Sequence, residues 1–168
     1  YNYRVDVDEE HVFESGVTVN GRRHTDPMFD VSVVYGVQGA YHYFQSSHSR
    51  WYLGFQYHQG HELAQFEELT LGDLTGMRGY PADFQRGDKR YSVTLERRYF
   101  TDIHIFNLAR LGAVVFYDTG KAWGIDEYGK SKLLSNVGFG LRFAPTKVRV
   151  GNIVHLDFAV PTSAKAGT

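Results

Sequence analysis

The sequence predicts an all-β fold, a single domain over residues 1–168 built as one antiparallel sheet of about eight or nine strands. Apolar and polar residues alternate with period two through most of the chain, which is typical of half-buried strands. Aromatic residues make up 15% of the composition, with 12 Tyr and 12 Phe, and these residue types favour strands. No comparable stretch has the 3.6-residue period of an amphipathic helix.

The alternation defines the expected strands in chain order. Seven segments carry it most clearly: 2–8, 29–38, 51–58, 91–98, 109–118, 136–143 and 153–160. Two further segments, 12–20 and 66–72, bring the number to eight or nine. Turn-prone clusters at 20–23, 45–49 and 126–130 lie between strands, and no linker or repeat interrupts the series. The chain is therefore expected to form an antiparallel meander.

Composition narrows the function classes. The formal net charge is −1, so there is no basic stripe to neutralise phosphates, and a nucleic-acid partner is not expected. The chain has no Cys, which excludes disulfides, thiolate metal sites and a Cys nucleophile. No apolar run reaches the ~18–20 residues of a membrane helix, whereas a membrane strand needs only ~9–11 residues of alternating pattern.

Alternation alone leaves open which face of the sheet meets water. In a soluble sandwich the apolar face points inward, whereas in a membrane barrel it points to lipid and the polar face lines the lumen. Several expected strands reach ten residues, against an average of ~5–6 in soluble proteins. Their polar faces combine Gly with Arg, Asp, Gln and His, which suits a crowded aqueous interior. These features favour a transmembrane β-barrel.

A loop around residues 69–88 carries the tripeptide Arg78-Gly79-Tyr80, and each of the next two strands has one acidic residue. Glu96 shares its strand face with Ser92 and Thr94, and Asp118 shares its face with Arg110 and Gly112, so both carboxylates lie on the polar side. A desolvated Arg is costly unless it is paired, and it prefers bidentate contact with carboxylates. We therefore expect Arg78 to contact Asp118, Glu96 or both inside the barrel. Four further residues are expected to line the lumen: Arg98, Arg110, Arg142 and Asp157.

This combination resembles the outer-membrane barrel superfamily of BamA, TamA and FhaC, across residues 69–161. Members carry an Arg-Gly-Phe or Arg-Gly-Tyr motif at the tip of a loop that folds back into the barrel. By this resemblance Arg78 is the inserted residue, Asp118 matches the acidic position of a Phe-x-Asp-x-Gly signature, and Glu96 with Arg98 matches a Glu-x-Arg pair. Family barrels end in a strand with a terminal aromatic residue. This sequence ends differently, so we expect a closing strand beyond it or another mode of closure.

The resemblance implies a protein that inserts or secretes proteins at the bacterial outer membrane, with lipid and client proteins as partners and no enzymatic activity or cofactor. A passive pore, or a membrane anchor for a fused or partner domain, is the alternative. A soluble β-barrel that binds a hydrophobic ligand is a third. Because eight or nine strands would form part of a larger wall, the missing half of the barrel or a second copy of the chain is an expected partner.

Other groups of polar and aromatic residues are interpreted more simply. His58, His61 and Glu62 lie near one another in the sequence, but no helix gives them metal-ligand spacing, so we expect them at a strand end and expect no metal site. No nucleophile or acid–base constellation indicates catalysis. Aromatic residues near strand ends are typical of the girdles of a membrane barrel: Trp51, Tyr99, Phe100, Tyr117 and Trp123.

Overall fold

The fold is all-β in the computed structural model, which describes residues 2–23, 31–63, 67–105, 109–124, 131–145 and 154–163. Among these residues no helix is long and apolar enough to cross a membrane. The elements described in full are the short 3₁₀ helix η2 (Asp73–Thr75) and the strands β1 (Asn2–Asp6), β2 (His11–Arg23), β3 (Val31–Phe44), β4 (Ser49–His61), β5 (Leu69–Leu71), β6 (Gln85–Gly87), β7 (Lys89–Ile105), β8 (Ala109–Trp123), β9 (Leu134–Pro145) and β10 (Val154–Pro161).

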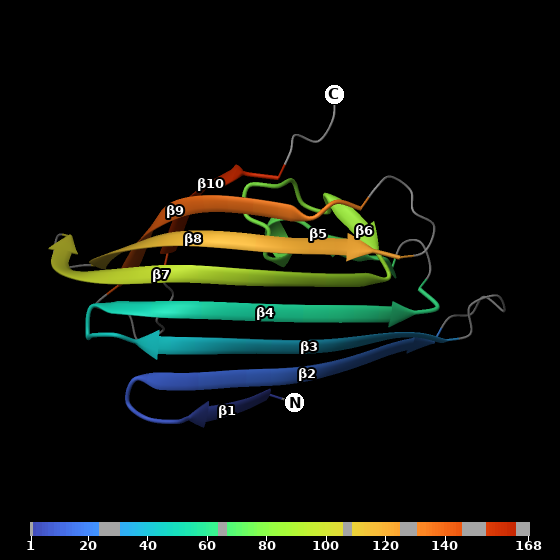
Figure 1. Cartoon of the computed structure of the whole chain (residues 1–168), viewed down its shortest axis with the longest axis horizontal. Coiled ribbons are helices and arrows are strands. Elements are labelled where there is room, and N and C mark those ends of the chain that lie inside the picture. Colours follow the sequence, from blue (N-terminus) through green and yellow to red (C-terminus); the bar gives the residue numbers. More distant parts are fainter. Residues whose placement is uncertain are drawn as a thin grey trace.

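Eight of the strands form a single antiparallel sheet in the order β1-β2-β3-β4-β7-β8-β9-β10, which is a meander (Figure 1). Each strand pairs with the next, apart from the 62–88 segment between β4 and β7. β1 and β10 are the two edges and do not pair with each other, so the sheet is open. The all-β class and the meander confirm the sequence prediction; a closed barrel is not formed by the strands described.

Most strands are longer than the alternation indicated, but the strand expected at 66–72 is only the three-residue β5, which pairs with β6 outside the eight-stranded sheet. β3 continues to Phe44, and β7 and β8 pair along most of their length apart from a register shift between Phe100 and His104. The prediction of a turn at 20–23 is wrong, because β2 continues through these residues to Arg23. Its residues pair with 31–34 of β3, and ladder hydrogen bonds outweigh the turn preference of Asn20-Gly21. The turn expected at 126–130 lies outside the described residues.

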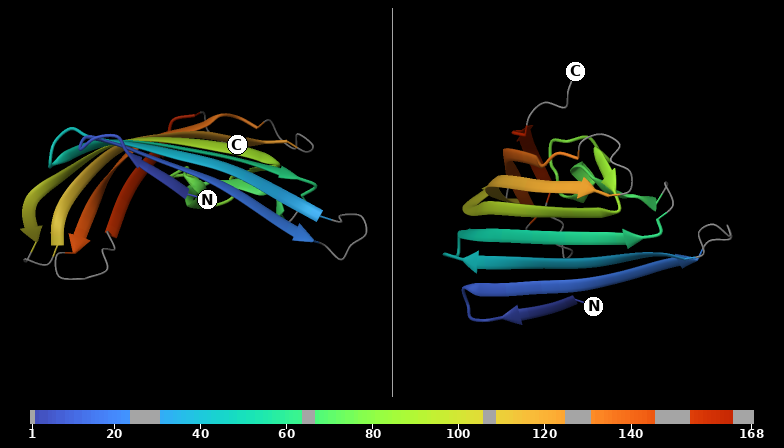
Figure 2. Two further views of the ribbon diagram at one scale, coloured as in Figure 1. Left: turned by 90° about the horizontal axis from the view of Figure 1, so that it is seen from below. Right: turned by 45° about the vertical axis from the view of Figure 1, so that its right-hand side comes forward.

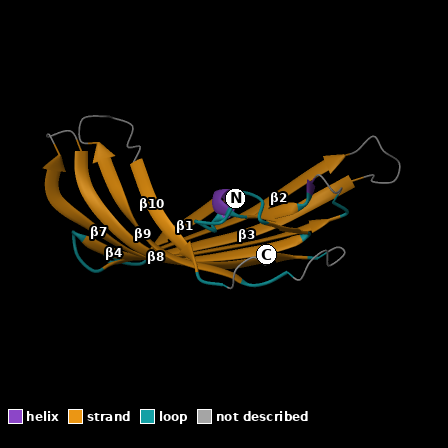
Figure 3. Ribbon diagram, turned by 90° about the horizontal axis from the view of Figure 1, so that it is seen from above, coloured by secondary structure: helices purple, strands orange, loops and turns teal. Residues whose placement is uncertain are grey.

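The sheet is strongly curved (Figures 2 and 3). Its two faces carry different kinds of side chain. The polar face is concave and carries the 3₁₀ helix and the short strands β5 and β6. The apolar face is convex and its large side chains remain exposed, for example Val37 (49%), Val115 (57%) and Phe139 (58%). Each strand thus places its apolar residues away from the segment that covers the other face.

The main buried apolar cluster lies under the 62–88 segment, on the concave face. β5 and β6 pair with each other, and residues of this segment pack on the end of β8 and the start of β9. Its members are Leu71, Met77, Tyr80, Ala122 and Leu134, with Phe84 packed against them. Burial of these side chains, at roughly 1.5–3 kcal/mol each, fixes the segment to the sheet. This packing positions the motif expected from the sequence.

Candidate functional site

The candidate site is the contact between Arg78 and the concave face of the sheet. Met77, which precedes Arg78, is fully buried and lies against the position of Gly120 in β8. Gly76 and Gly79 both have positive φ angles, 102° and 80°, a conformation that favours glycine. The chain therefore turns sharply on both sides of Met77-Arg78, and the guanidinium group is directed at the strands.

Arg78 makes both contacts that the sequence analysis expects. Its Nε and Nη2 donate to the two carboxylate oxygens of Asp118 on β8, at 2.9 and 2.8 Å. Its Nη1 lies 2.8 Å from Oε1 of Glu96 on β7. The bidentate geometry with Asp118 is the strong form of the Arg–carboxylate pair. Asp118 is 0% exposed, so the loop cation neutralises a carboxylate that water does not reach.

A third carboxylate, from the edge strand, joins this pair. Nη1 of Arg78 donates to Oδ2 of Asp157 on β10, at 3.3 Å. Asp157 also accepts hydrogen bonds from Arg142 on β9, and Glu96 accepts one from Arg98 at 2.5 Å. Three Arg and three acidic residues, all on the concave face, therefore form one electrically balanced cluster.

The surroundings favour the charged state of Arg78. Its guanidinium lies over the ring of Phe116, with Cζ 3.5 Å from the ring centroid, so one face of the group is covered by an aromatic side chain. Burial works against the charged form, but hydrogen bonds and charge from Asp118, together with the charge of Glu96, outweigh it and raise the pKa of Arg78. Arg78 is therefore charged at every pH at which its carboxylate partners are ionised.

The rest of the motif, Gly79 and Tyr80, lies along the edge strand β10. A Cβ atom at Gly79 would lie 2.9 Å from Cβ of Ala159, so only glycine allows this approach to β10. The Tyr80 hydroxyl donates to the carbonyl oxygen of Ser135 at 2.8 Å and lies 2.6 Å from Oγ of Ser163. Arg78, Gly79 and Tyr80 thus contact Asp157, Ala159 and Ser163 in turn. The motif connects the loop to β10 as well as to β7 and β8.

The structure separates the remaining expected residues into two groups. Arg98, Arg142 and Asp157 belong to the Arg78 cluster, although the sequence analysis expected them only as lining residues. Arg110 does not join it. Arg110 lies eight residues from Asp118 along β8, about 26 Å away at strand spacing, and bonds to Asp102 and to the carbonyl oxygen of Thr101. The local sequence did not predict the contact between Arg78 and Asp157. It indicated only that Asp157 lies on the polar face of its strand.

The two histidines noted in the sequence lie near the end of β4. Among the described residues, no group of three His, Cys, Asp or Glu side chains could hold a metal ion. His61 lies 3.7 Å from Glu62 in an exposed pair. His58 is on the concave face, where its ring fills the space that a Cβ at Gly36 would occupy. These residues are separate from the Arg78 cluster.

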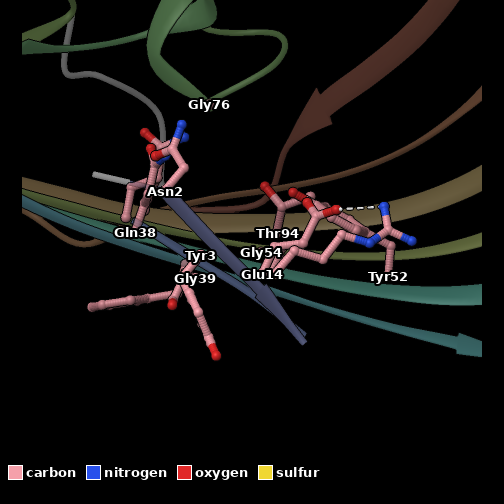
Figure 4. A pocket seen from close by; sticks show the side chains of 15 residues that line it. Asn2, Tyr3, Glu14, Gln38, Gly39, Tyr52, Gly54, Gly76 and Thr94 are labelled. Atoms are coloured by element: carbon pink, nitrogen blue, oxygen red, sulfur yellow. Dashed lines mark hydrogen bonds and ion pairs between the residues drawn. The ribbon is translucent and has the colours of Figure 1, made fainter. Parts of the chain in front are cut away.

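A hollow of about 420 Å³ lies next to the loop on the concave face (Figure 4). Gly76 of the loop borders it on one side, and side chains of β1 to β4 and β7 border it on the other. Most of its lining is polar or small, including Glu14, Gln38, Thr94 and Gly54. The loop therefore leaves part of the concave face uncovered.

In comparisons with protein-family models, curated proteins and solved structures, nothing matches the chain.

We expect Arg78 and Asp118 to act as a coupled pair in folding stability. Arg78→Ala and Asp118→Ala should each lower the free energy of unfolding by ~3–5 kcal/mol, because each leaves a buried charge with too few partners. The double variant should be little worse than either single variant, because the same interaction is lost. Denaturant titration of the four proteins gives the coupling energy.

Arg4→Ala is the matched control for this cycle. Arg4 pairs with Asp6 and Glu14, but its side chain is 60% exposed, and its loss should cost no more than ~1 kcal/mol. Additive losses for Arg78 and Asp118 would show that the contact does not stabilise the fold.

Tyr80→Phe should loosen β10 selectively. The variant keeps the ring, which packs 5.1 Å from that of Phe84, and removes only the hydroxyl group that bonds Ser135 and Ser163. A lost buried hydrogen bond of ~1 kcal/mol corresponds to about fivefold faster exchange of the β10 backbone amides. Hydrogen exchange should leave β2 and β3 unchanged, and Tyr99→Phe, at an exposed convex position, should alter neither region. Equal acceleration throughout the sheet would contradict a specific tie to β10.

Proposed function

We propose that this chain forms part of the wall of a transmembrane antiparallel β-barrel in the bacterial outer membrane. We further propose that it belongs to the BamA, TamA and FhaC superfamily and takes part in inserting or secreting proteins. The observation that carries the proposal is the polarity of the sheet. An Arg-Gly-Tyr loop is bound by charges on the concave face, while the convex face is apolar and uncovered.

The size of the exposed apolar face supports a lipid environment. Soluble monomers rarely expose contiguous apolar patches beyond about 300–600 Å². Here exposed large apolar side chains occur on every strand of the eight-stranded sheet. They include Val5, Phe13, Val37, Phe55, Leu95, Val115, Phe139 and Phe158, one from each of the eight strands, at 41% exposure or more. A bilayer would remove this surface from water without any further protein.

The dimensions of the apolar face also suit a bilayer. On β4 the convex positions between Ser49 and Gln59 are Trp51, Leu53, Phe55 and Tyr57, none of them charged. Ten residue steps span ~33 Å along a strand, or about 25 Å of height at a tilt of about 40°. The apolar band of outer-membrane barrels is ~25 Å tall. Trp51 and Tyr57 would then lie toward the two interfaces, where aromatic girdles occur.

The few charged residues on the convex face lie near the ends of the strands. Outside the bulged end of β7 and the last residue of β2, Arg23, the convex positions of the described strands carry no carboxylate, and their Lys and Arg residues are Lys89, Arg97 and Lys121. Lys89 and Lys121 are at the loop end of their strands. Arg97 is level with the start of β4, where it donates to Ser49 Oγ at 3.0 Å and lies over the ring of Trp51. Long cationic side chains at such positions can reach the headgroup region.

The open edges require further strands under this proposal. Unpaired backbone groups cannot face lipid, so β1 and β10 each need a partner strand. Another part of a longer chain or a second copy would supply them. The Arg78 cluster would then hold the curvature of the wall near the β10 seam, and a seam that can open would admit a client strand. No bond chemistry is needed for this work.

Adjacent residues of β3 give a direct test of the membrane assignment. Val37 and Gln38 are both exposed, but Val37 is on the convex face and Gln38 borders the hollow on the concave face. In bilayers, Val37→Arg should cost ~2–4 kcal/mol of folding stability, whereas Gln38→Arg should cost no more than ~1 kcal/mol. Unfolding titrations in lipid vesicles measure both. Equal, small effects would contradict contact of the convex face with lipid.

Depletion of the protein in its native bacterium tests the function. Folded outer-membrane proteins, resolved by heat-modifiable gel mobility, and secreted proteins should both be quantified before and after depletion. Restoration by the wild-type gene and failure of Arg78→Ala at equal protein level are expected for an assembly or secretion protein. Unchanged assembly together with altered solute permeability would instead identify a passive pore.

A further inference from the structure

Two lysines share the convex face at the loop end of the sheet. Lys89 begins β7 and pairs in register with Trp123 of β8, while Tyr91 of β7 pairs with Lys121 of β8. Lys89 and Lys121 are therefore diagonal neighbours on one face, with backbones ~7–8 Å apart. Their ammonium groups can converge on one acceptor, because each side chain rotates freely about four methylene carbons.

On the convex face, the neighbours of these lysines are aromatic and neutral, whereas the carboxylate of Asp88 lies beside Gly124. The ring of Trp123 lies 5.9 Å from that of Tyr91, in an edge-on arrangement, and 6.5 Å from that of Tyr57 on β4. Gln59 is opposite Lys89 on the β4 side. Within the described residues, neither lysine forms an ion pair with a carboxylate. Two cations thus lie in an aromatic patch, with no acidic partner among the residues that the structure describes.

We propose that Lys89, Lys121, Tyr57, Tyr91 and Trp123 form a binding site for the phosphate group of an anionic lipid. The ammonium groups would bind the phosphate oxygens, and the aromatic rings would lie along the glycerol and upper acyl region. The contrast with Arg97 supports this assignment, because Arg97 is already engaged by Ser49 and Trp51. The inference rests on the membrane location proposed above and adds the class of lipid that the wall selects.

A lipid fits this patch better than free phosphate does. The lysines are next to the exposed apolar convex face, which includes Val37 and Phe55 of the neighbouring strands. A headgroup bound here would have its acyl chains directed along that face. Basic residues near a membrane surface attract anionic lipids by an amount that corresponds to about fivefold in affinity for each residue.

Quenching of Trp123 fluorescence tests the proposal at the site itself. The chain has two Trp, so Trp51→Phe leaves Trp123 as the reporter. The full chain is reconstituted into phosphatidylcholine bilayers that contain either brominated phosphatidylglycerol or brominated phosphatidylcholine. We expect the anionic lipid to quench Trp123 preferentially, with a relative association constant that falls about fivefold for Lys89→Gln and again for Lys121→Gln.

Matched variants separate charge from folding. Lys89→Arg with Lys121→Arg should keep the preference, and Lys132→Gln, at an exposed position outside the patch, should leave it unchanged. Preferential quenching that persists in the double Gln variant would overturn the site. Equal quenching by both lipids in the protein with Lys89 and Lys121 unchanged would refute the lipid site but not the membrane location. Absence of quenching by either lipid would refute the membrane location itself.

Competition distinguishes the source of the phosphate. Inorganic phosphate and chloride are added at equal ionic strength, so that screening is the same in both. A preference retained in both solutions supports the lipid headgroup as ligand. A preference abolished by inorganic phosphate alone would show that the site binds the free ion, and would overturn the lipid assignment.

Discussion

The guanidinium of Arg78 is the interaction on which the concave side of the sheet depends. It brings together carboxylates from three strands, Asp118 on β8, Glu96 on β7 and Asp157 on β10, and Asp118 is fully buried. Arg98 and Arg142 complete the charge balance. Desolvated charges stabilise a fold only when they are paired with good geometry, and here the bidentate contact with Asp118 supplies that geometry. The loop and the curved wall therefore require each other.

The sheet reverses the usual arrangement of a soluble domain. Its apolar cluster is small and is confined to the contact of the 62–88 segment with β8 and β9, while most of its large apolar side chains are exposed on the convex face. Hydrophobic burial within the chain therefore accounts for the attachment of the loop but leaves the convex side chains uncovered. An apolar medium on the convex side would cover them, and the polar concave face would then enclose water, ions and the loop.

Strand parity explains how much of the candidate site was predictable. Because side chains alternate along a strand, the sequence placed Glu96, Arg98, Asp118 and Arg142 on polar faces, and the requirement for pairing linked Arg78 to the acidic residues. Contacts with both expected carboxylates are present. The same reasoning could not separate Arg110 from the cluster, because parity gives the face of a residue and not its height along the strand. The extent of β2 was also underestimated, since the turn preference of Asn20-Gly21 is a local signal and pairing with β3 is not.

The sequence by itself determined the all-β class, the order of the strands and the side of the sheet on which each charge lies, because these follow from periodicity within single strands. Only the tertiary structure decided that the motif follows β10, with Gly79 against Ala159 and Tyr80 bound to Ser135 and Ser163. Contacts between residues 55 to 83 positions apart depend on the curvature of the sheet and on the register of four successive strands. Those quantities arise from the summed pairing and packing of the whole wall, and no local pattern encodes them.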